Sequence, residues 1–258
     1  MASYARGTGS NVSAKRRNAG SGQQRVENDI LRALPRSELD VLLPKMEISA
    51  YPARHVLTEA SKPIEHCYFL NEGVVSIIHV MTDGRSIEVG LTGKEGFIGL
   101  PVIVGCEVSL VRSVIQVAAA GYKLSAENLK SVLQSCPVLE SKLHRYSQEF
   151  SIQTIQIAAC NRLHSVDKQL SRWLLMTQDR VGKPSFPLTQ EFISHMLGTR
   201  RASVSVAASL LQKRGLITYT RGQVTIKDRA GLEKASCECY GEINKLLEAW
   251  GKVLQLQD

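Results

Sequence analysis

The sequence has no run of about 20 consecutive apolar residues, the length that a membrane-spanning helix needs. Its first residues also lack the continuous apolar core of a secretory signal. We therefore expect a cytoplasmic protein without a membrane partner. With 258 residues, 43% of them hydrophobic, the chain is long enough for about two domains with apolar cores.

Cysteine is scarce and scattered, at positions 67, 106, 136, 160, 237 and 239. No two of these residues form the Cys-x-x-Cys pair that is typical of zinc sites, and residues 1–66 contain no cysteine. Thiols of a cytoplasmic protein are reduced by default. The sequence therefore predicts no metal ligands, no iron–sulfur cluster and no other resident cofactor.

Signatures of catalysis are missing as well. The chain has neither a P-loop nor a recognisable Ser/His/Asp spacing. We therefore predict that the protein is not an enzyme. The alternative is an enzyme whose catalytic residues are dispersed over a β domain and therefore form no recognisable motif.

The net charge of +8 is distributed unevenly along the chain. Residues 1–25 hold five basic residues and no acid, and residues 183–234 hold nine basic residues against three acids. Clustered positive charge is typical of surfaces that bind nucleic acid, although a solvated charged face is the alternative. Residues 1–25, rich in Gly, Ser and Asn, are predicted to form a disordered basic tail.

Residues 26–136 are predicted to form an antiparallel β domain behind a short helical start. Short apolar, β-branched runs alternate here with Gly, Asp and Asn, and Asp83-Gly84 between two such runs is a hairpin signal. Many short strands at close spacing favour a barrel-like or rolled sheet.

Residues 137–167 are predicted to form a long helix that starts at Pro137 and a hinge near Ser165. Apolar residues recur in steps of four and three, which is the period of a coiled coil. We expect this seam to form the interface of a homodimer; a helix lying on its own domain's core is the alternative. The seam comprises Leu139, Leu143, Tyr146, Phe150, Gln153, Ile157, Cys160 and His164.

Residues 168–234 are predicted to form a winged helix-turn-helix domain. Two amphipathic segments meet at Gly198, where a left-handed residue ends the first helix, with Thr189 and Thr199 as the expected N-caps. Two alternating runs around Arg221-Gly222 then predict a hairpin, the wing. Residues 235–258 add an amphipathic helix, which either packs on this domain or contacts RNA polymerase.

In such a unit the second helix lies in the major groove of double-stranded DNA, with its first residues at the base edges. Arginine there can bind guanine, while hydroxyls and the remaining cations suit phosphates. The expected DNA contacts are Thr189, Thr199, Arg200, Arg201, Ser203, Ser205, Lys213 and Arg221.

The order of β domain, long helix and winged helix-turn-helix resembles the Crp/Fnr family of bacterial transcription regulators, over roughly residues 30–234. The most specific match is Leu188-Thr189-Gln190-Glu191 followed by the run Gly198–Val204 (GTRRASV). The resemblance implies an α+β protein with a β-roll like that of cyclic-nucleotide-binding proteins. It also implies a homodimer on a palindromic operator. Arg201 falls at the family's recognition arginine, whereas Ala202 and Val206 depart from the cyclic-AMP receptor type.

The resemblance also places an effector site in the β-roll, with Gly99, Arg112, Ser113 and Thr154 as candidate contacts. Cyclic-AMP-binding members carry a Glu for the ribose hydroxyl, where this chain has Leu100-Pro101. We therefore do not expect cyclic AMP to be the effector, and Arg112 paired with a local Glu is the alternative for that residue.

Two other family sensors are also unexpected. The oxygen-sensing type needs an N-terminal cysteine cluster, which residues 1–66 lack, and a haem sensor needs an axial ligand. His79 stands in a strand-like run, but a lone histidine on a strand is more often an ordinary surface or core residue. The predicted function is thus a sequence-specific DNA-binding regulator whose effector is unidentified. The alternative is a cyclic-nucleotide-binding module that signals to a protein partner.

Overall fold

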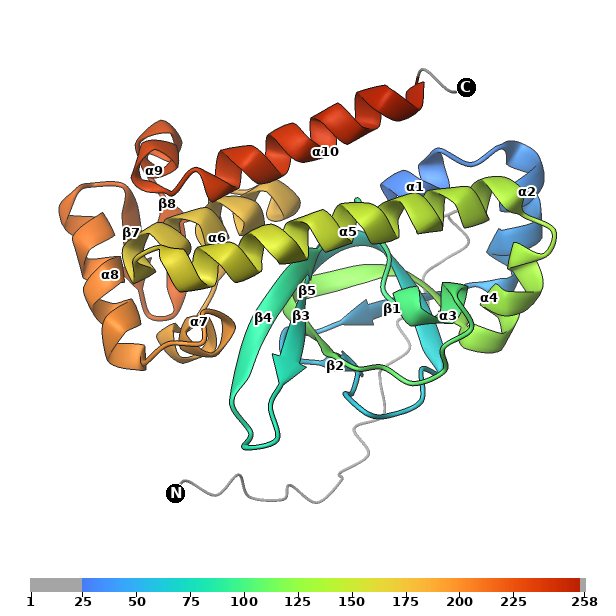
Figure 1. The fold of residues 1–258 in the computed structure, drawn as a ribbon, viewed down its shortest axis with the longest axis horizontal. Coiled ribbons are helices and arrows are strands. Elements are labelled where there is room, and N and C mark those ends of the chain that lie inside the picture. Colours follow the sequence, from blue (N-terminus) through green and yellow to red (C-terminus); the bar gives the residue numbers. More distant parts are fainter. Residues whose placement is uncertain (1–24, 256–258) are drawn as a thin grey trace.

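The computed structural model describes residues 25–255 (Figure 1). An antiparallel β domain, a long helix and a mainly helical C-terminal domain follow one another, so the predicted α+β class is confirmed. The basic tail expected over residues 1–25 lies outside the described residues except for Arg25. None of the helices in the described part of the chain is both long and apolar enough to cross a bilayer.

The N-terminal domain is built around one five-stranded antiparallel sheet. Its strand order is β1-β5-β3-β4, and β2 also pairs with β5. The elements of this domain are α1 (Asp29–Arg32), α2 (Arg36–Leu42), η1 (Leu43–Lys45), β1 (Glu47–Tyr51), β2 (Val56–Thr58), β3 (His66–Val80), β4 (Ser86–Thr92), α3 (Leu100–Ile103), β5 (Arg112–Ser125) and α4 (Ala126–Leu133).

The two long strands β3 and β5 make the sheet curl into a roll (Figure 1). Their register runs from His66 opposite Ser125 to Ile78 opposite Arg112, with irregularities around Gly73. Such irregularities bend a strand and increase its twist. Gly73 has φ +92°, and a Cβ there would collide with Ala119, so this bend requires glycine.

Helix α5 (Pro137–Leu163) confirms the long helix, but the seam predicted as a dimer interface faces inward. Six of its eight residues are buried within the chain, and Phe150 and His164 are half-buried. Gln153 accepts from the backbone N–H of Leu91 (2.8 Å) and donates to its carbonyl (3.2 Å), which satisfies the edge strand β4. Most of the seam therefore packs inside its own chain, while Cys160 and His164 at its end meet Cys237 and Cys239. The dimer interface predicted on this buried face is wrong.

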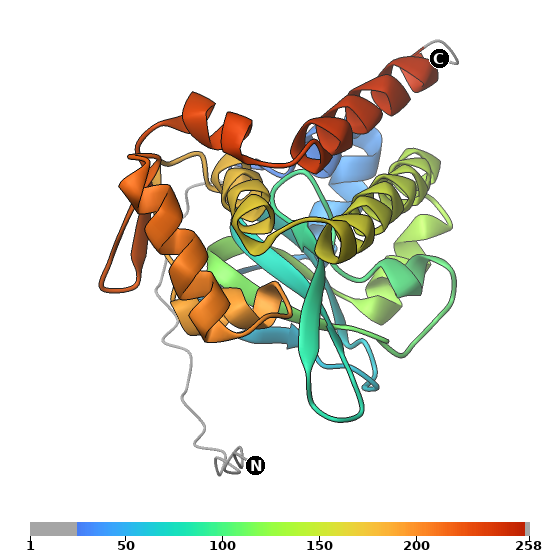
Figure 2. The ribbon, with the colours of Figure 1, turned by 60° about the vertical axis from the view of Figure 1, so that its left-hand side comes forward.

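The C-terminal domain combines helices with a three-stranded sheet of order β6-β8-β7. Its elements are α6 (Val166–Val181), β6 (Ser185–Pro187), α7 (Gln190–Met196), α8 (Arg201–Lys213), β7 (Ile217–Thr220), β8 (Gln223–Ile226), α9 (Arg229–Ala235) and α10 (Cys239–Gln255). Helix α10 begins against α5 and α6, and its far end stands clear of the rest of the described chain (Figure 2).

The two domains share one apolar cluster. Leu91 and Val114 of the β sheet lie in the same cluster as Trp173 of α6 and the inner faces of α7 and α8. An ion pair crosses the same boundary, between Arg180 of α6 and Glu95, which follows β4 (2.7 Å). The C-terminal domain is therefore packed against β4 in this structure.

Candidate nucleic-acid interface and effector cavity

The turn between α7 and α8 is set by local sequence. The backbone N–H of Phe192 donates to Thr189 Oγ1 (3.1 Å), so Thr189 caps α7 as predicted. Gly198 ends the helix at φ +59° in the left-handed region. The cap predicted at Thr199 is wrong, since Arg200 is the N-cap of α8 and no side chain caps that helix.

The first turn of α8 presents uncompensated positive charge. Arg200 and Arg201 are exposed, and neither forms an ion pair within the described part of the chain. The backbone N–H groups at a helix N-terminus already carry positive potential, so two arginines there favour a polyanion. Val204 of the same helix is fully buried and fixes the orientation of this turn.

The wing places another cation beside these helices. Arg221 and Gly222 have φ +50° and +75°, the pair of positive values that a tight type I′ hairpin requires. Tyr219 donates its hydroxyl to the carbonyl of Leu188 (2.9 Å), which ties the wing to the start of α7. Arg221 at the tip is exposed.

The remaining predicted DNA contacts differ in accessibility. Lys213 is exposed at the end of α8, whereas Ser203 and Ser205 are half-buried. Thr189 is half-buried and uses its hydroxyl for the cap. The structure thus places the predicted residues at the N-caps of α7 and α8, in the turn between these helices, on α8 and in the wing.

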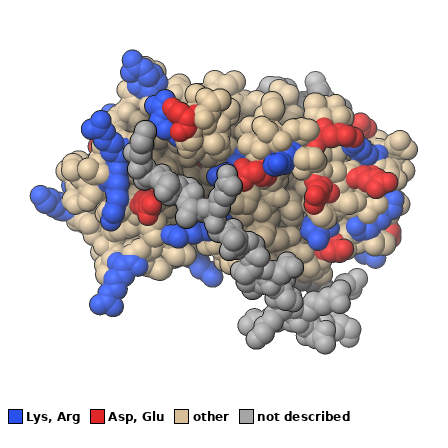
Figure 3. Space-filling model, turned by 90° about the horizontal axis from the view of Figure 1, so that it is seen from below, with Lys and Arg blue, Asp and Glu red and all other residues tan. Residues whose placement is uncertain are grey.

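Charge separates the two domains on the surface as well. In the β domain, cations such as Arg112, Lys123 and Lys130 are paired with carboxylates. Figure 3 shows Lys and Arg largely without acidic neighbours toward the C-terminal domain, and mixed charges toward the other end. Unpaired cations keep their attraction for phosphate, so the C-terminal domain is the candidate nucleic-acid interface.

The helix-turn-helix contacts the β domain through α7 and the turn that follows it. Gly198 lies against Ile87 of β4, so close that a Cβ on Gly198 would come within 2.9 Å of Ile87 Cδ1. The sequence contains no signal for this contact, because it joins residues far apart in the chain.

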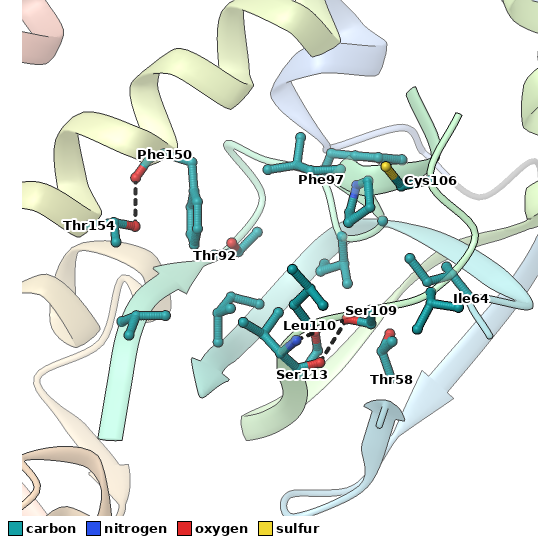
Figure 4. A pocket seen from close by; sticks show the side chains of 18 of the residues that line it. Thr58, Ile64, Thr92, Phe97, Cys106, Ser109, Leu110, Ser113, Phe150 and Thr154 are labelled. Atoms are coloured by element: carbon teal, nitrogen blue, oxygen red, sulfur yellow. Dashed lines mark hydrogen bonds between the residues drawn. The ribbon is translucent and has the colours of Figure 1, made fainter. Parts of the chain in front are cut away.

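A cavity of about 860 Å³ lies between the roll and α5 (Figure 4). This volume is in the range of small-molecule sites. Its walls are mostly apolar and include Ile64, Ile77, Val89, Phe97, Leu110, Val111, Phe150 and Ile155.

Three of the four predicted effector residues line this cavity, namely Gly99, Ser113 and Thr154. Arg112 is not among the lining residues. It forms an ion pair with Glu59, with Nε 2.7 Å from Oε1. The interpretation of Arg112 as a residue paired with a local Glu therefore describes its state in the structure.

The cavity offers little to an anionic ligand. No Lys or Arg is found among its described lining residues, and its one acidic residue, Glu107, is bound by Lys130 (2.6 Å). Ser109 donates to the carbonyl of Val111 (2.7 Å) and Thr154 to that of Phe150 (3.0 Å), so these two hydroxyls already have acceptors (Figure 4). The site suits an apolar molecule better than a phosphate.

A cluster that sequence spacing did not reveal forms where α5 ends. Cys160, His164, Cys237 and Cys239 bring one ligand atom each to within 4.8 Å of one another, and we call them the Cys3His cluster. The hydrogen bond from Cys237 holds the pKa of the Cys160 thiol below its usual value. Cys160 and Cys237 lie 77 positions apart, which is why no short motif marks the site.

Two family profiles match the chain. A cyclic nucleotide-binding domain profile matches residues 48–136, and a Crp-like helix-turn-helix domain profile matches residues 168–235. Together they cover more than half of the sequence. A comparison with curated proteins gave no match.

Solved structures of similar fold come from several bacteria. FixK2 from Bradyrhizobium japonicum is 15% identical with a TM-score of 0.64, covering 74% of this chain and 98% of its own. The c-di-GMP-responsive global regulator CLP from Xanthomonas campestris is 18% identical with a TM-score of 0.59, covering 74% and 98%. A CRP-family transcriptional regulator from Thermus thermophilus is 18% identical with a TM-score of 0.60, covering 73% and 96%.

Proposed function

The chain belongs to the Crp/Fnr family of transcription regulators, and from this premise we propose that it binds a two-fold symmetric DNA site as a homodimer. Helix α8 of each subunit would lie in a major groove, with Arg200 and Arg201 toward the bases and Arg221 of the wing on the backbone. The observation that carries this proposal is the unpaired charge at the start of α8. Such a regulator acts where the DNA is, so we place it in the cytoplasm.

The homodimer would form through the outward face of α5. Five exposed residues recur there in steps of three and four and form the outer stripe: Gln148, Ser151, Ile155, Ala158 and Arg162. Ile155 is 70% exposed, and Leu163 nearby is 75% exposed. Ile155 and Ala158 are the apolar members of the outer stripe, and exposed apolar residues at this spacing favour pairing with a second copy of the same helix.

The effector would be a small, uncharged and mainly apolar molecule in the cavity of the β-roll. Phe150, Thr154 and Ile155 of α5 line that cavity, so a bound molecule touches the helix that also carries the outer stripe. A ligand that favours one arrangement of α5 would shift the population of DNA-binding dimers. The break between α5 and α6 at Ser165 is where the two domains would turn.

Selection of DNA from a random library by the full chain tests the DNA-binding proposal. We expect enrichment of two inverted half-sites whose centres lie about one helical turn, 10–10.5 base pairs, or a multiple of that apart. Enrichment of single half-sites would count against the dimer, and no enrichment would favour a module that signals to a protein partner. Contact with RNA polymerase stays a prediction.

A further inference from the structure

We propose that the Cys3His cluster is a binding site for one Zn²⁺ ion, which joins the end of α5 to the segment between α9 and α10. The site does not depend on the proposed DNA sequence or effector. Two of its ligands, Cys160 and His164, come from one helix end, and the other two, Cys237 and Cys239, flank Glu238.

The distances between the ligand atoms fit a tetrahedral ion. Zn–S bonds of about 2.3 Å and Zn–N bonds of about 2.0–2.1 Å set sulfur–sulfur distances of about 3.8 Å and sulfur–nitrogen distances of about 3.6 Å. The observed distances are 3.4 Å between Cys160 Sγ and Cys237 Sγ, and 3.5 Å between Cys239 Sγ and His164 Nδ1. Small adjustments of side chains would admit the ion.

His164 is oriented as metal-bound histidines are. Its Nε2 lies 3.2 Å from Glu238 Oε1, while its Nδ1 faces the sulfur atoms. A carboxylate on the far nitrogen holds the proton there and leaves the lone pair of the near nitrogen free for the metal. The residue between the two cysteines thus selects the tautomer that the site needs.

A buried cation beside the cluster supplies an independent argument. Arg172 is 1% exposed, and no carboxylate of the described residues lies at ion-pair distance from its guanidinium, although its charge acts on the buried Glu88. It donates instead to Cys160 Sγ (3.2 Å), Met176 Sδ (3.4 Å) and Asn161 Oδ1 (3.4 Å). A buried charge that no opposite charge contacts directly is costly.

Zinc binding would place an opposite charge in direct contact with Arg172. Zn²⁺ with three thiolates and a neutral histidine has a net charge of −1, next to the positive charge of Arg172. Gln156 donates a further N–H to Cys239 Sγ (3.1 Å), which suits a thiolate. The surroundings of the cluster therefore fit the metal-bound anion better than three neutral thiols.

The ligand set favours zinc in a closed, structural site. All three cysteines are buried, and the His164 side chain is 16% exposed, which leaves no open position for a substrate. An iron–sulfur cluster places inorganic iron and sulfide between the protein ligands, for which atoms within 4.8 Å of one another leave no room. The bound ion would fix the direction in which α10 leaves the molecule, next to the break between α5 and α6.

The test is the metal content of the full-length protein, purified without added metal and again after chelation and exposure to Zn²⁺. We expect about one Zn²⁺ per chain by elemental mass spectrometry. Substitution with Co²⁺ should give the visible d–d bands of a tetrahedral site and thiolate-to-cobalt charge transfer. Cys237→Ser and His164→Gln should each lose the ion, whereas Cys106→Ser, which removes an exposed thiol elsewhere, should retain it.

Several results would overturn the proposal. One is that Cys237→Ser retains as much zinc as the wild-type protein. Another is that the protein contains iron with acid-labile sulfide. A third is that metal-free protein forms a Cys160–Cys237 disulfide under reducing conditions. If Cys237→Ser does not fold, the chelated wild-type protein decides, since stoichiometric Zn²⁺ should then raise its Tm and Mg²⁺ should not. Failure of DNA selection would leave each of these readouts unchanged.

Discussion

Trp173 of α6 donates its indole N–H to Glu88 of β4 across 2.8 Å, and both residues are buried where the two domains meet. The second carboxylate oxygen of Glu88 has no hydrogen-bond partner in the described structure. Burial raises the pKa of this carboxyl to about 7, even though the charge of Arg172 acts to lower it. The contact between the domains therefore contains a group that titrates near neutral pH.

Stability should fall with rising pH because of Glu88. Its pKa in the folded state lies above the ordinary value of 4.5, so the folded protein binds the proton more tightly than the unfolded chain does. The contribution is fully present below about pH 4.5 and is lost as the pH rises toward about 7, with a size on the order of 3 kcal/mol. Urea unfolding between these pH values should show that slope.

Glu88→Gln should remove most of this pH dependence, because the amide stays neutral. Glu72→Gln, a substitution of an exposed glutamate in β3, should leave the slope as it is. Equal slopes for wild type and Glu88→Gln would show that the carboxyl does not titrate in this range.

Arg201→Ala should weaken binding to the selected DNA site by about 1–3 kcal/mol, about 5-fold to 150-fold in Kd, and relax the preference for one base pair. Fluorescence anisotropy with a labelled duplex measures the affinity. Arg36→Ala is the matched control, since it removes an exposed arginine that pairs with Asp40 at the other end of the molecule. Similar affinities for both variants would refute the role assigned to Arg201.

Ile155→Glu should convert the dimer into a monomer, because it places two carboxylates opposite each other in the proposed helix pair. Light scattering at micromolar concentration reads the mass. Val41→Glu introduces the same charge at an exposed apolar residue of α2 and should leave the dimer intact. If the Ile155→Glu protein is still a dimer, the proposed interface on α5 is wrong, and α10 becomes the next candidate for the dimer interface.

The cavity should bind an apolar fluorescent probe but not cyclic AMP. A ligand at 100 times its Kd raises stability by about 2.7 kcal/mol, so a thermal-shift experiment detects either one. Thr154→Phe fills part of the cavity and should lower affinity for the probe at least about tenfold. Ser131→Phe, at an exposed position of α4, is the control. A clear thermal shift with cyclic AMP would contradict the conclusion that the cavity suits an apolar molecule better than a phosphate.

Local signals accounted for much of the fold. Thr189, Gly198 and the Arg221-Gly222 turn each act within a few residues, so the helix-turn-helix and the wing could be predicted from short stretches. The cap at Thr199 was misplaced by one residue, which is within the usual variation of helix ends.

Features that depend on distant parts of the chain were not predictable in this way. The heptad period showed that α5 has an apolar face but not what covers it, and Leu139 and Leu143 turned out to pack on their own domain. Cys160 and Cys237 meet only because α5 and the α9–α10 segment converge in the folded protein. The periodicity of a sequence shows which face of one helix is apolar. Which other element covers that face depends on the topology of the whole fold.

The shared apolar cluster bears on how such a regulator can be divided. A fragment starting at Val166 would expose Trp173, which is now buried, together with the ring nitrogen that Glu88 accepts from. We therefore do not expect the C-terminal domain to fold independently of the β domain. A chimaera that joins it to a different sensor would need a matching β4 surface, and both halves should melt in a single transition.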